Sequence, residues 1–385
     1  MLRQGRYVRH KDHKNMSPEV KNNLVMKKNG GYKNVKTAIL VPTLCRNKHL
    51  EKCLESLKKN PWAKYVDLYI GVDYPTKDSH WPGYREILKL MERDYSMFRS
   101  FHLFKRPTNY GADENLDALF QEAIKDHEQF IFMEDDVELS ENYLEYMLKA
   151  LDYFRDDPDV ISVSGYSYPV KLKTGDNCNV ISQNAIFNMW GAGFWKNKFE
   201  VSRKEIEQDL CLIRDFSYNI KHYKFSRYRR SDYINCVAGV DPNDKDVRKL
   251  CYMFTSMTDI AMGVYMQVKG KYQAMPVISK VRNNGFDGTG LYCQAIKPTK
   301  SGRITSDTYY YSRQPIDRRK HFTLSYDGGR SRKTAFRTLD RFIKPSAVMV
   351  MKSNIKLSAD RILGKRKLKM LRIIHKQFRN HQVSH

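Results

Sequence analysis

From Thr37 onwards, short runs of β-branched and aromatic residues alternate with segments of helical periodicity. Each run is four to eight residues long, and apolar side chains then recur every three or four positions. Because strand-helix-strand successions place consecutive strands parallel, the alternation predicts an α/β fold with a mostly parallel central sheet and helices on both faces. The predicted strands are Thr37–Val41, Tyr65–Val72, Phe101–Phe104, Phe130–Met133 and Val160–Val163.

Helices are predicted between and after these strands, each with an apolar stripe. Ser140 is expected to cap the helix that follows the fourth strand, because a serine hydroxyl accepts a hydrogen bond from the free amides of a first turn. The stripes contain Leu50, Leu54 and Leu57; Tyr84, Ile87, Leu88 and Met91; Leu116, Leu119, Phe120, Ala123 and Ile124; and Tyr143, Leu144, Met147, Leu148 and Leu151.

Polar side chains gather where the predicted strands end. Thr43 and Arg46 follow the first strand, Asp73 follows the second, and Glu134–Asp136 follow the fourth. In open α/β sheets, ligands bind beyond the carboxyl ends of the strands. The chain has no G-x-G-x-x-G after its first strand and no G-x-x-x-x-G-K-[ST] segment. A dinucleotide-binding or P-loop enzyme is therefore disfavoured.

The three consecutive carboxylates at Glu134–Asp136 repel one another unless water or a cation relieves them. Oxygen ligands in this pattern suit Mn²⁺ or Mg²⁺, commonly with a diphosphate that completes the coordination shell. The competing interpretation is an acidic loop that interacts with the dipole of the next helix. The position after a fourth parallel strand favours the metal, which would neutralise charge on a departing nucleotide.

The segment Met133–Leu139, followed by Tyr143–Tyr146, closely resembles the D-x-D-type motif of the GT-A glycosyltransferases. The closest likeness is to the N-acetylglucosaminyltransferase I family and its bacterial glycosyltransferase family 2-like relatives, in which the motif is E-D-D. The likeness extends from about Thr37 to Cys293 and implies a GT-A fold that binds a nucleotide diphosphate-sugar.

The resemblance also assigns roles in the donor site. It implies that Asp136 is the direct metal ligand and that Glu134 and Asp135 contact ribose, sugar or metal-bound water. Val41-Pro42-Thr43 and Arg46 look like the opening nucleotide-binding segment of the family, so Pro42, Thr43 and Arg46 are expected to bind the nucleotide. Asp73 matches the acidic residue that typically holds the uracil or ribose, which favours UDP over GDP.

Two arginines are candidate diphosphate contacts. Arg106 follows the third strand and could steady the diphosphate, although an ordinary loop role is equally compatible with its position. Arg282 begins a glycine-rich segment, Arg282–Gly290, whose flexibility would suit a lid. It looks like the loop after the last core strand in bacterial relatives, where a histidine is expected soon afterwards. Here Leu291-Tyr292-Cys293 stands in that place, which puts a third protein ligand to the metal in doubt.

The acceptor side is predicted from a segment rich in tryptophan and glycine, Asn188–Trp195. A similar segment lines the sugar side of the cleft in relatives, so Trp190 and Gly191 are assigned to acceptor binding, with a tightly packed turn as the alternative. Asp259 stands among apolar residues of a predicted helix and, by the resemblance, is the catalytic base. Asp232 and Asp241 are the fallback candidates.

The net charge of +25 is concentrated at the ends of the chain. Residues 1–36 carry +8 and residues 330–385 carry +14, which favours an anionic partner. Within residues 365–379, Leu371, Ile374 and Phe378 share one helical face among many cations, as in helices that bind membrane surfaces. The predicted parts are a basic N-terminal segment (1–36), a nucleotide-sugar-binding half (37–165), an acceptor-binding and catalytic half (166–298), and a basic helical C-terminal extension (299–385).

These features predict an inverting, Mn²⁺- or Mg²⁺-dependent glycosyltransferase. It would move a hexose or N-acetylhexosamine from a UDP-sugar to a glycan or lipid-linked acceptor in cell-surface polysaccharide synthesis. No secretory signal is expected, and the seven scattered cysteines form no C-x-x-C pair, so a cytoplasmic enzyme, peripheral on the inner face of the membrane, is expected. The alternatives are a catalytically weak GT-A protein that binds glycans and a basic nucleic-acid-binding protein. Nucleic acid is not an expected partner, because the central part of the chain is nearly neutral.

Overall fold

The computed structural model describes residues 35–174, 178–208, 259–290, 314–342 and 351. Contacts divide the chain into two units, Met1–Asn34 and Val35–His385, and every described residue belongs to the second unit. The amphipathic segment 365–379 and the fallback residues Asp232 and Asp241 lie outside the described residues.

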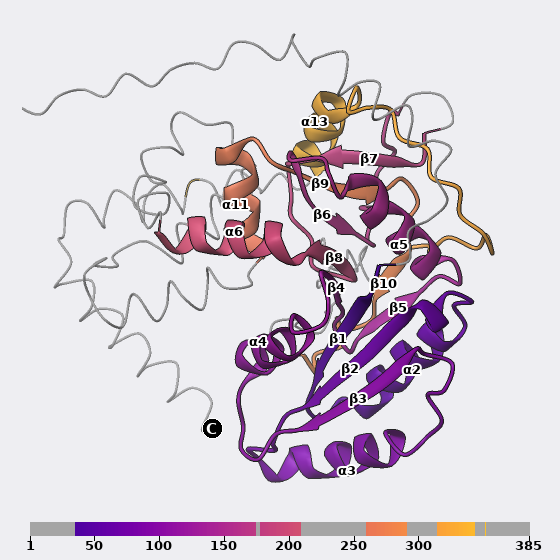
Figure 1. Cartoon of the computed structure of the whole chain (residues 1–385), viewed down its shortest axis with the longest axis vertical. Coiled ribbons are helices and arrows are strands. Elements are labelled where there is room, and N and C mark those ends of the chain that lie inside the picture. Colours follow the sequence, from indigo (N-terminus) through magenta and orange to yellow (C-terminus); the bar gives the residue numbers. More distant parts are fainter. Residues whose placement is uncertain (1–34, 175–177, 209–258, 291–313, 343–350, 352–385) are drawn as a thin grey trace, which may run out of the picture. The chain divides into compact units, whose positions relative to one another are not determined.

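The described residues of the second unit are built around an eight-stranded sheet with the strand order β3-β2-β1-β4-β8-β6-β9-β7 (Figure 1). The strands are β1 (Thr37–Thr43), β2 (Val66–Val72), β3 (Ser100–Lys105), β4 (Gln129–Phe132), β6 (Val160–Ser164), β7 (Val180–Gln183), β8 (Ala192–Trp195) and β9 (Tyr272–Pro276). A second, antiparallel sheet pairs β5 (Val137–Leu139) with β10 (Val281–Asn283). The helices are α2 (Asn47–Lys58), η2 (Ala63–Tyr65), η3 (Asp78–His80), α3 (Trp81–Leu90), α4 (Ala112–Ala123), α5 (Tyr143–Phe154), α6 (Lys196–Gln208), α11 (Asp259–Lys269) and α13 (Arg332–Phe342).

The first four strands are parallel and form the predicted β-α half of the sheet. β1 pairs in parallel with β2 on one side and with β4 on the other, and β3 joins the outer edge of β2. Ala38 and Leu40 of β1 belong to the same core cluster as Leu116 and Phe120 of α4. Alternate residues of a strand point to opposite faces, and α2 lies on the side of β1 and β2 away from α4 (Figure 1). The prediction of helices on both faces is confirmed.

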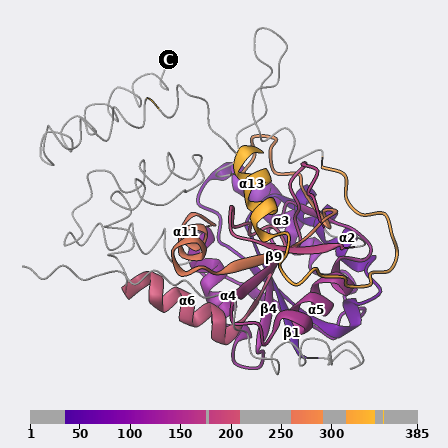
Figure 2. The same cartoon turned by 90° about the horizontal axis from the view of Figure 1, so that it is seen from above.

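The other half of the sheet departs from a simple β-α repeat. β8 runs antiparallel to both β4 and β6, β9 is parallel to β6, and β7 runs antiparallel to β9 at the far edge. Gly193 lets β8 pack closely on α5, because a Cβ there would collide with the sulfur of Met147. Helices α6 and α11 lie side by side in both views (Figures 1 and 2), and Tyr265 donates a 2.9 Å hydrogen bond to Glu205 between them. The sheet is therefore continuous across the two predicted halves.

The predicted cap of α5 is wrong. The helix begins at Tyr143, and the side chain of its N-cap residue, Asn142, makes no capping hydrogen bond; the free N–H of Leu144 in the first turn donates instead to Asn60 Oδ1 at 2.9 Å. Ser140 lies too far upstream, and its hydroxyl instead donates to Asn142 Oδ1 at 2.9 Å. The serine therefore orders the turn before the helix.

Part of the predicted C-terminal extension packs on the body of the fold. Asn179 and Val180 both donate to the carbonyl of Ser325, and Val180 forms a parallel bridge with Tyr326. Helix α13 then packs against β7, and Arg332 donates to Ser182 Oγ at 2.7 Å. Residues 314–342 thus continue the α/β unit beyond the boundary predicted at residue 298. Within the described ranges, no helix combines the length and apolar composition that a membrane span requires.

Candidate active site

The strand order reverses between β1 and β4, because β2 and β3 lie on one side of β1 and β4 on the other. Loops leaving the carboxyl ends of two such strands part in opposite directions and leave a place for a ligand. Thr43 ends β1, Arg46 precedes α2, and Glu134–Asp136 follow β4 directly. The tertiary structure therefore brings together the two groups of polar residues that were predicted to form the donor site.

Arg46, Asp135 and Asp136 form what we call the acid cluster. Thr43 Oγ1 donates to Asp135 Oδ2 at 2.8 Å, Arg46 pairs with Asp135 Oδ1, and its other terminal nitrogen lies 2.8 Å from Asp136 Oδ2. Asp135 is 5% exposed and Asp136 is 3% exposed, so two acids share one cation away from water. Asp136 Oδ1 is buried and has no hydrogen-bond partner among the residues that the structure describes.

The acid cluster contains two carboxyl groups but only one cationic side chain, Arg46. Burial raises the pKa of Asp135, Arg46 opposes this rise, and the neighbouring charge of Asp136 adds to it. Burial also disfavours the charged form of Arg46, but Asp135 and Asp136 outweigh this effect and raise its pKa. A carboxylate oxygen buried without a partner costs free energy. The acid cluster would therefore be stabilised by a further cation.

The last residue of β10 and the loop that follows it, residues 283–287, cover the acid cluster; we call this segment the cover loop. The backbone N–H of Asn284 donates to the carbonyl of Asp136 at 2.8 Å, and a Cβ on Gly285 would collide with Asp136 Oδ2. Asp287 pairs with His49 of α2 at 3.1 Å. The side-chain nitrogen of Asn283 is buried without a partner, as is Asp136 Oδ1. The glycine-rich segment was recognised in the sequence, but nothing local to it indicated Asp136 and His49 as its contacts.

The acid cluster can supply one protein ligand to a divalent cation, but it does not form a complete coordination site. In the described part of the chain, no three His, Cys, Asp or Glu side chains come together as a ready metal site. Asp136 nevertheless offers a buried, unpartnered carboxylate oxygen, the ligand type that Mn²⁺ and Mg²⁺ accept. The residues present therefore fit a cation that Asp136 would hold, with its remaining ligands to be supplied by a bound phosphate compound and water.

Asp73 has a structural role that the sequence did not reveal. Its two buried oxygens accept hydrogen bonds from the backbone of Tyr74, Tyr110 and Gly111 and from the side chain of Asn109, at 2.7 to 3.0 Å. The carboxylate thereby fastens the loop after β3 to the end of β2. A direct contact between Asp73 and a nucleotide stays a prediction.

Arg106 is held in a defined place beside this loop. Its guanidinium donates to Asn115 Oδ1 at 2.8 Å and lies over the rings of Phe104 and Tyr110, at 5.6 and 5.2 Å from their centroids. Partial burial lowers the pKa of Arg106. Asn115 in turn donates to the carbonyl of Gly71 at 2.8 Å. These contacts orient Arg106 on β3 and α4, and its role at a diphosphate stays a prediction.

Trp190 and Gly191 lie near the cover loop. The partly buried indole of Trp190 packs edge-on against Tyr166, at 4.7 Å between centroids, and against Phe286 of the cover loop, at 5.9 Å. Gly191 has a positive φ of 56°, and a Cβ there would lie 2.9 Å from the hydroxyl of Tyr143. The tight packing anticipated as an alternative is thus present at Gly191, whereas Trp190 contacts the cover loop through Phe286.

The other residues predicted for the site are Arg282, Pro42, Glu134 and the candidate base Asp259. Arg282 lies in β10, where it pairs with Glu138 at 3.4 Å and donates to the carbonyl of Gln314 at 3.0 Å. Pro42 is partly buried in β1, and Glu134 is partly buried between β4 and the acid cluster. Asp259 begins helix α11, as predicted, but its side chain is outside the described part of the structure. Trp195 is buried, and its indole donates to the carbonyl of Leu151.

A comparison with known protein families finds a match over the region that contains the acid cluster. Residues 38–210 match the sequence model described as glycosyl transferase family 2. This match covers somewhat less than half of the chain and shows that the region is similar to glycosyltransferase family 2 domains. The matched region contains β1, β4 and the acid cluster, and with the strand order it supports the predicted GT-A fold. The closer resemblance to N-acetylglucosaminyltransferase I stays a prediction.

The solved structures that match this chain include S. aureus TarS and a mannosyltransferase, both at low overall similarity. S. aureus TarS 1-349 in complex with UDP matches with 18% identity and a TM-score of 0.27, over 37% of this chain and 37% of that chain. The mannosyltransferase PcManGT from Pyrobaculum calidifontis, in complex with GDP-Man and Mn²⁺, matches with 10% identity and a TM-score of 0.35, over 66% of this chain and 81% of that one. This chain thus spans just over a third of the matched TarS structure. A search of curated proteins finds no match.

Proposed function

We propose that this protein is a metal-dependent, inverting glycosyltransferase that uses a nucleotide diphosphate-sugar, with UDP as the favoured nucleotide. The observation that supports this most is the unpartnered, buried oxygen of Asp136 at the reversal of strand order in a region similar to glycosyltransferase family 2 domains. A divalent cation there would neutralise the charge that develops on the leaving nucleoside diphosphate. A hexose or N-acetylhexosamine is the proposed transferred group.

The chain's own residues have separate tasks in this proposal. Asp136 would hold the cation, while Arg46 pairs with both Asp135 and Asp136 and fixes their positions. Thr43 orients Asp135 by its hydrogen bond, and Glu134 borders the donor. The cover loop excludes water from the acid cluster, which strengthens the electrostatic interactions beneath it.

The test is release of nucleotide from a panel of UDP- and GDP-sugars, with Mn²⁺ and with chelator. Wild type, Asp136→Ala and the control Asp78→Ala, which removes an exposed carboxylate, are assayed together. We expect slow hydrolysis of one donor that is lost with chelator and in Asp136→Ala but kept in Asp78→Ala. No turnover, together with no Mn²⁺-dependent thermal stabilisation by UDP or GDP, would refute the donor site and favour a glycan-binding protein.

Asp259 is the proposed base that removes the proton from the acceptor hydroxyl. Inversion requires one base opposite the leaving group, and Asp259 stands at the start of α11, whose next residues are apolar. Asp259→Asn is expected to abolish transfer to an acceptor while slow hydrolysis and donor binding remain. Loss of transfer in Asp232→Asn or Asp241→Asn instead, with Asp259→Asn active, would reassign the base.

We also propose that the enzyme acts peripherally at the inner, anionic face of a membrane, on a glycan or lipid-linked acceptor of a cell-surface polysaccharide. Lys333, Arg337 and Arg341 are exposed on α13 at intervals of four residues, and Ala335 and Leu339 are buried on its other side. The three cations thus form one stripe that faces away from β7. Residues 343–385 add eleven lysines and arginines and one acid.

Vesicle sedimentation tests this location. Each lysine or arginine close to an anionic surface contributes about 1 kcal/mol, so Lys333→Glu/Arg337→Glu/Arg341→Glu should reduce binding to phosphatidylserine vesicles by at least about tenfold. The control Lys52→Glu/Lys59→Glu/Lys64→Glu changes the net charge equally at exposed lysines of another surface and should bind more tightly than the α13 variant. Tight binding to duplex DNA without vesicle binding at the same salt would favour the nucleic-acid alternative.

A further inference from the structure

The antiparallel pair β5–β10, which we call the ribbon, connects the acid cluster with a second charged cluster. Its pairs are Val137↔Asn283, Glu138↔Arg282 and Leu139↔Val281. Asp136 and Asn284 adjoin the ribbon at one end. At the other end, the N–H of Ser140 donates to the carbonyl of Lys280 at 2.9 Å. Since each strand residue advances the chain by about 3.4 Å, the ends are roughly 10 Å apart.

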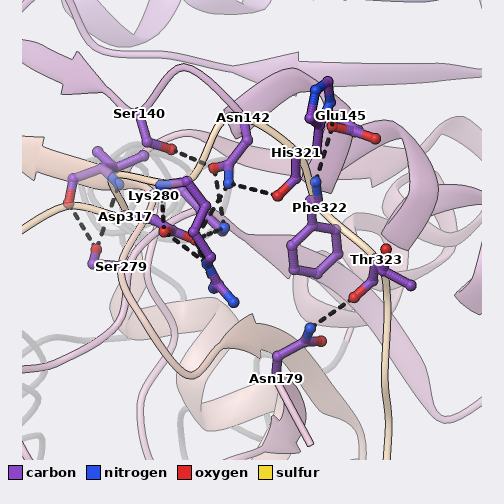
Figure 3. A network of polar contacts seen from close by, with 12 residues as sticks. Ser140, Asn142, Glu145, Asn179, Ser279, Lys280, Asp317, His321, Phe322 and Thr323 are labelled. Carbon is purple, nitrogen blue, oxygen red and sulfur yellow. Dashed lines mark hydrogen bonds and ion pairs between the residues drawn. The ribbon is translucent and has the colours of Figure 1, made fainter. Parts of the chain in front are cut away.

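Lys280 anchors the second cluster (Figure 3). Its ammonium group pairs with Asp317 and donates to Asn142 Oδ1 at 3.1 Å, and the side chains of Lys280 and Asp317 are 1% and 3% exposed. The rings of Phe322 and Tyr146 lie 4.6 and 5.6 Å from the ammonium nitrogen. We call Asn142, Lys280, Asp317 and Arg319 the lysine cluster. Burial lowers the pKa of Lys280 to about 8 although Asp317 opposes the shift.

The partner of Lys280 belongs to a segment distant in sequence, Gln314–Phe322, which we call the strap. The N–H of Asp317 donates to the carbonyl of Ser279 at 2.8 Å, and Arg282 of β10 donates to the carbonyl of Gln314 at 3.0 Å. The strap therefore holds β10 at residues before and within the strand. Its far end is fixed on α5, where Phe322 N–H donates to Glu145 at 2.9 Å (Figure 3). Lys149 of the same helix donates to the Phe322 carbonyl at 2.7 Å.

We infer that Lys280 and Asp317 are a positioning pair that, by fastening the strap to the ribbon, holds the cover loop in place against Asp136. The ribbon is the physical link, because Lys280 immediately precedes β10 and Asn284 immediately follows it. The effect on the reaction rests on the proposed role of Asp136, whereas the mechanical link between the pair and the cover loop does not. The strap lies outside the region that matches the family model, residues 38–210.

Stability alone is a weak reason for this arrangement. A buried ion pair gains little over well-packed apolar residues because desolvation offsets the attraction. The hydrogen bonds of the lysine cluster are directional, however, and every polar side-chain atom of Asn142 has a partner: Oδ1 accepts from Ser140 and Lys280, and Nδ2 donates to Asp317 and to the His321 carbonyl. Such a network defines one orientation of β10 relative to α5.

Lys198 provides a matched control for Lys280. Its ammonium group lies 3.9 Å from the centroid of Trp195 and donates to the carbonyls of Phe154, Asp157 and Val160. Burial lowers the pKa of Lys198 to about 8, as it does for Lys280. Lys198 contacts the end of α5 and β6 rather than the ribbon. Lys280→Met and Lys198→Met therefore each remove a partly or fully buried ammonium group, but only the first releases β10.

Hydrogen exchange of the full-length protein tests the mechanical link. In Lys280→Met, the amides of Asn284 and Gly285 should exchange at least about tenfold faster than in wild type, because their acceptors on Asp136 and Asn283 are no longer held in register. Lys198→Met should leave those two amides unchanged. Asp317→Asn serves as the second variant if Lys280→Met does not fold, and it should show the same acceleration.

Kinetics then separates positioning from a loss of folded protein. The donor is the one that the nucleotide-release assay identifies. With that donor, Lys280→Met should lower kcat for hydrolysis about tenfold and change KM by less than about twofold, whereas Lys198→Met should change neither. Faster exchange confined to the strap, or equal acceleration of the cover loop in Lys198→Met, would overturn the inference. Absence of turnover in the wild type, together with no Mn²⁺-dependent thermal stabilisation by UDP or GDP, would refute the proposed function but not this inference, since the exchange result stands independently of activity.

Discussion

The two ends of the ribbon carry charged clusters of opposite composition. At one end, Asp135 and Asp136 share the single guanidinium of Arg46. At the other end, Lys280 and Arg319 share the single carboxylate of Asp317. Burial raises the pKa of Asp135, whereas the hydrogen bonds from Arg319 and Lys280 outweigh burial and hold the pKa of Asp317 well below its usual range.

The clusters also differ in how completely their polar atoms are paired. Asp136 Oδ1 and the side-chain nitrogen of Asn283 are buried without partners at the acid cluster. Both oxygens of Asp317 accept hydrogen bonds at the lysine cluster, as do both oxygens of Glu145 beside it. Unpaired buried groups cost free energy and are retained where a ligand completes them. The comparison therefore supports the proposals that the acid cluster binds a ligand and that the lysine cluster holds the local structure in place.

Asp136→Asn gives the largest expected effect. Donor turnover should fall about a thousandfold, roughly 4 kcal/mol in the activation barrier, because the cation loses its carboxylate ligand. The free energy of unfolding should stay the same or increase, since one of two like charges is removed. Nucleotide release and urea denaturation measure the two quantities. A marked loss of stability with activity retained would reverse the assignment of the two clusters.

Asp317→Ala, in contrast to Asp136→Asn, should lower the free energy of unfolding. It leaves the ammonium group of Lys280 buried without its carboxylate, which should cost about 3 kcal/mol in the free energy of unfolding. Urea denaturation near pH 7 measures it, with Asp78→Ala as the surface control, expected to change stability by less than about 0.5 kcal/mol. A cost below about 1 kcal/mol would show that the lysine cluster is not a stabilising element.

Arg46→Met should make stability depend on pH in a specific direction. Removing the guanidinium raises the pKa of Asp135 further, because burial and the charge of Asp136 are then opposed only by the hydrogen bond from Thr43. A carboxyl group whose pKa is raised in the folded state stabilises the fold at low pH and loses that contribution as pH rises through the folded pKa. The variant should therefore be about 2 kcal/mol less stable than wild type near pH 7 and closer to it near pH 4. Denaturation at both pH values checks this, and a constant difference would contradict it.

His49→Ala should have the smallest effect. The side chain of its partner, Asp287, is 43% exposed, and exposed pairs contribute little, so the unfolding free energy should change by less than about 0.5 kcal/mol. The amide of Thr289, which donates to Asp287 at 3.0 Å, should exchange at most about threefold faster. A larger change in stability would mean that the cover loop is fastened chiefly through α2.

The sequence predicted those elements of the fold that depend on the hydrophobic pattern of neighbouring residues. The strands predicted at Thr37–Val41, Tyr65–Val72 and Phe130–Met133 correspond to β1, β2 and β4 with boundaries shifted by one or two residues. The antiparallel insertion of β8 between β4 and β6 was not predicted, because a short buried strand has the same residue pattern in either direction. The cap of α5 was predicted wrongly because Ser140 bonds within the preceding turn.

The candidate site was predictable in part. Local sequence was enough to indicate that Thr43, Arg46 and Glu134–Asp136 would meet, since carboxyl ends of neighbouring parallel strands lie at one edge of a sheet. It did not show that Asp73 is engaged by the loop after β3, or that the cover loop reaches Asp136. Those contacts depend on the path of loops, for which residue periodicity carries no information.

The alternation of strands and helices and the acid triplet at a strand end follow from residue type and spacing alone, because hydrophobic periodicity reports which face of an element is buried. Which charges pair, and which buried oxygen is left without a partner, follow only from packing. Thr43 and Asp135 are 92 positions apart and Lys280 and Asp317 are 37 apart. Contacts over such separations form only when the whole sheet and the strap are in place. The tertiary structure therefore decides which side chains make up the acid cluster, where the proposed chemistry occurs, and the lysine cluster, which is proposed to hold the cover loop.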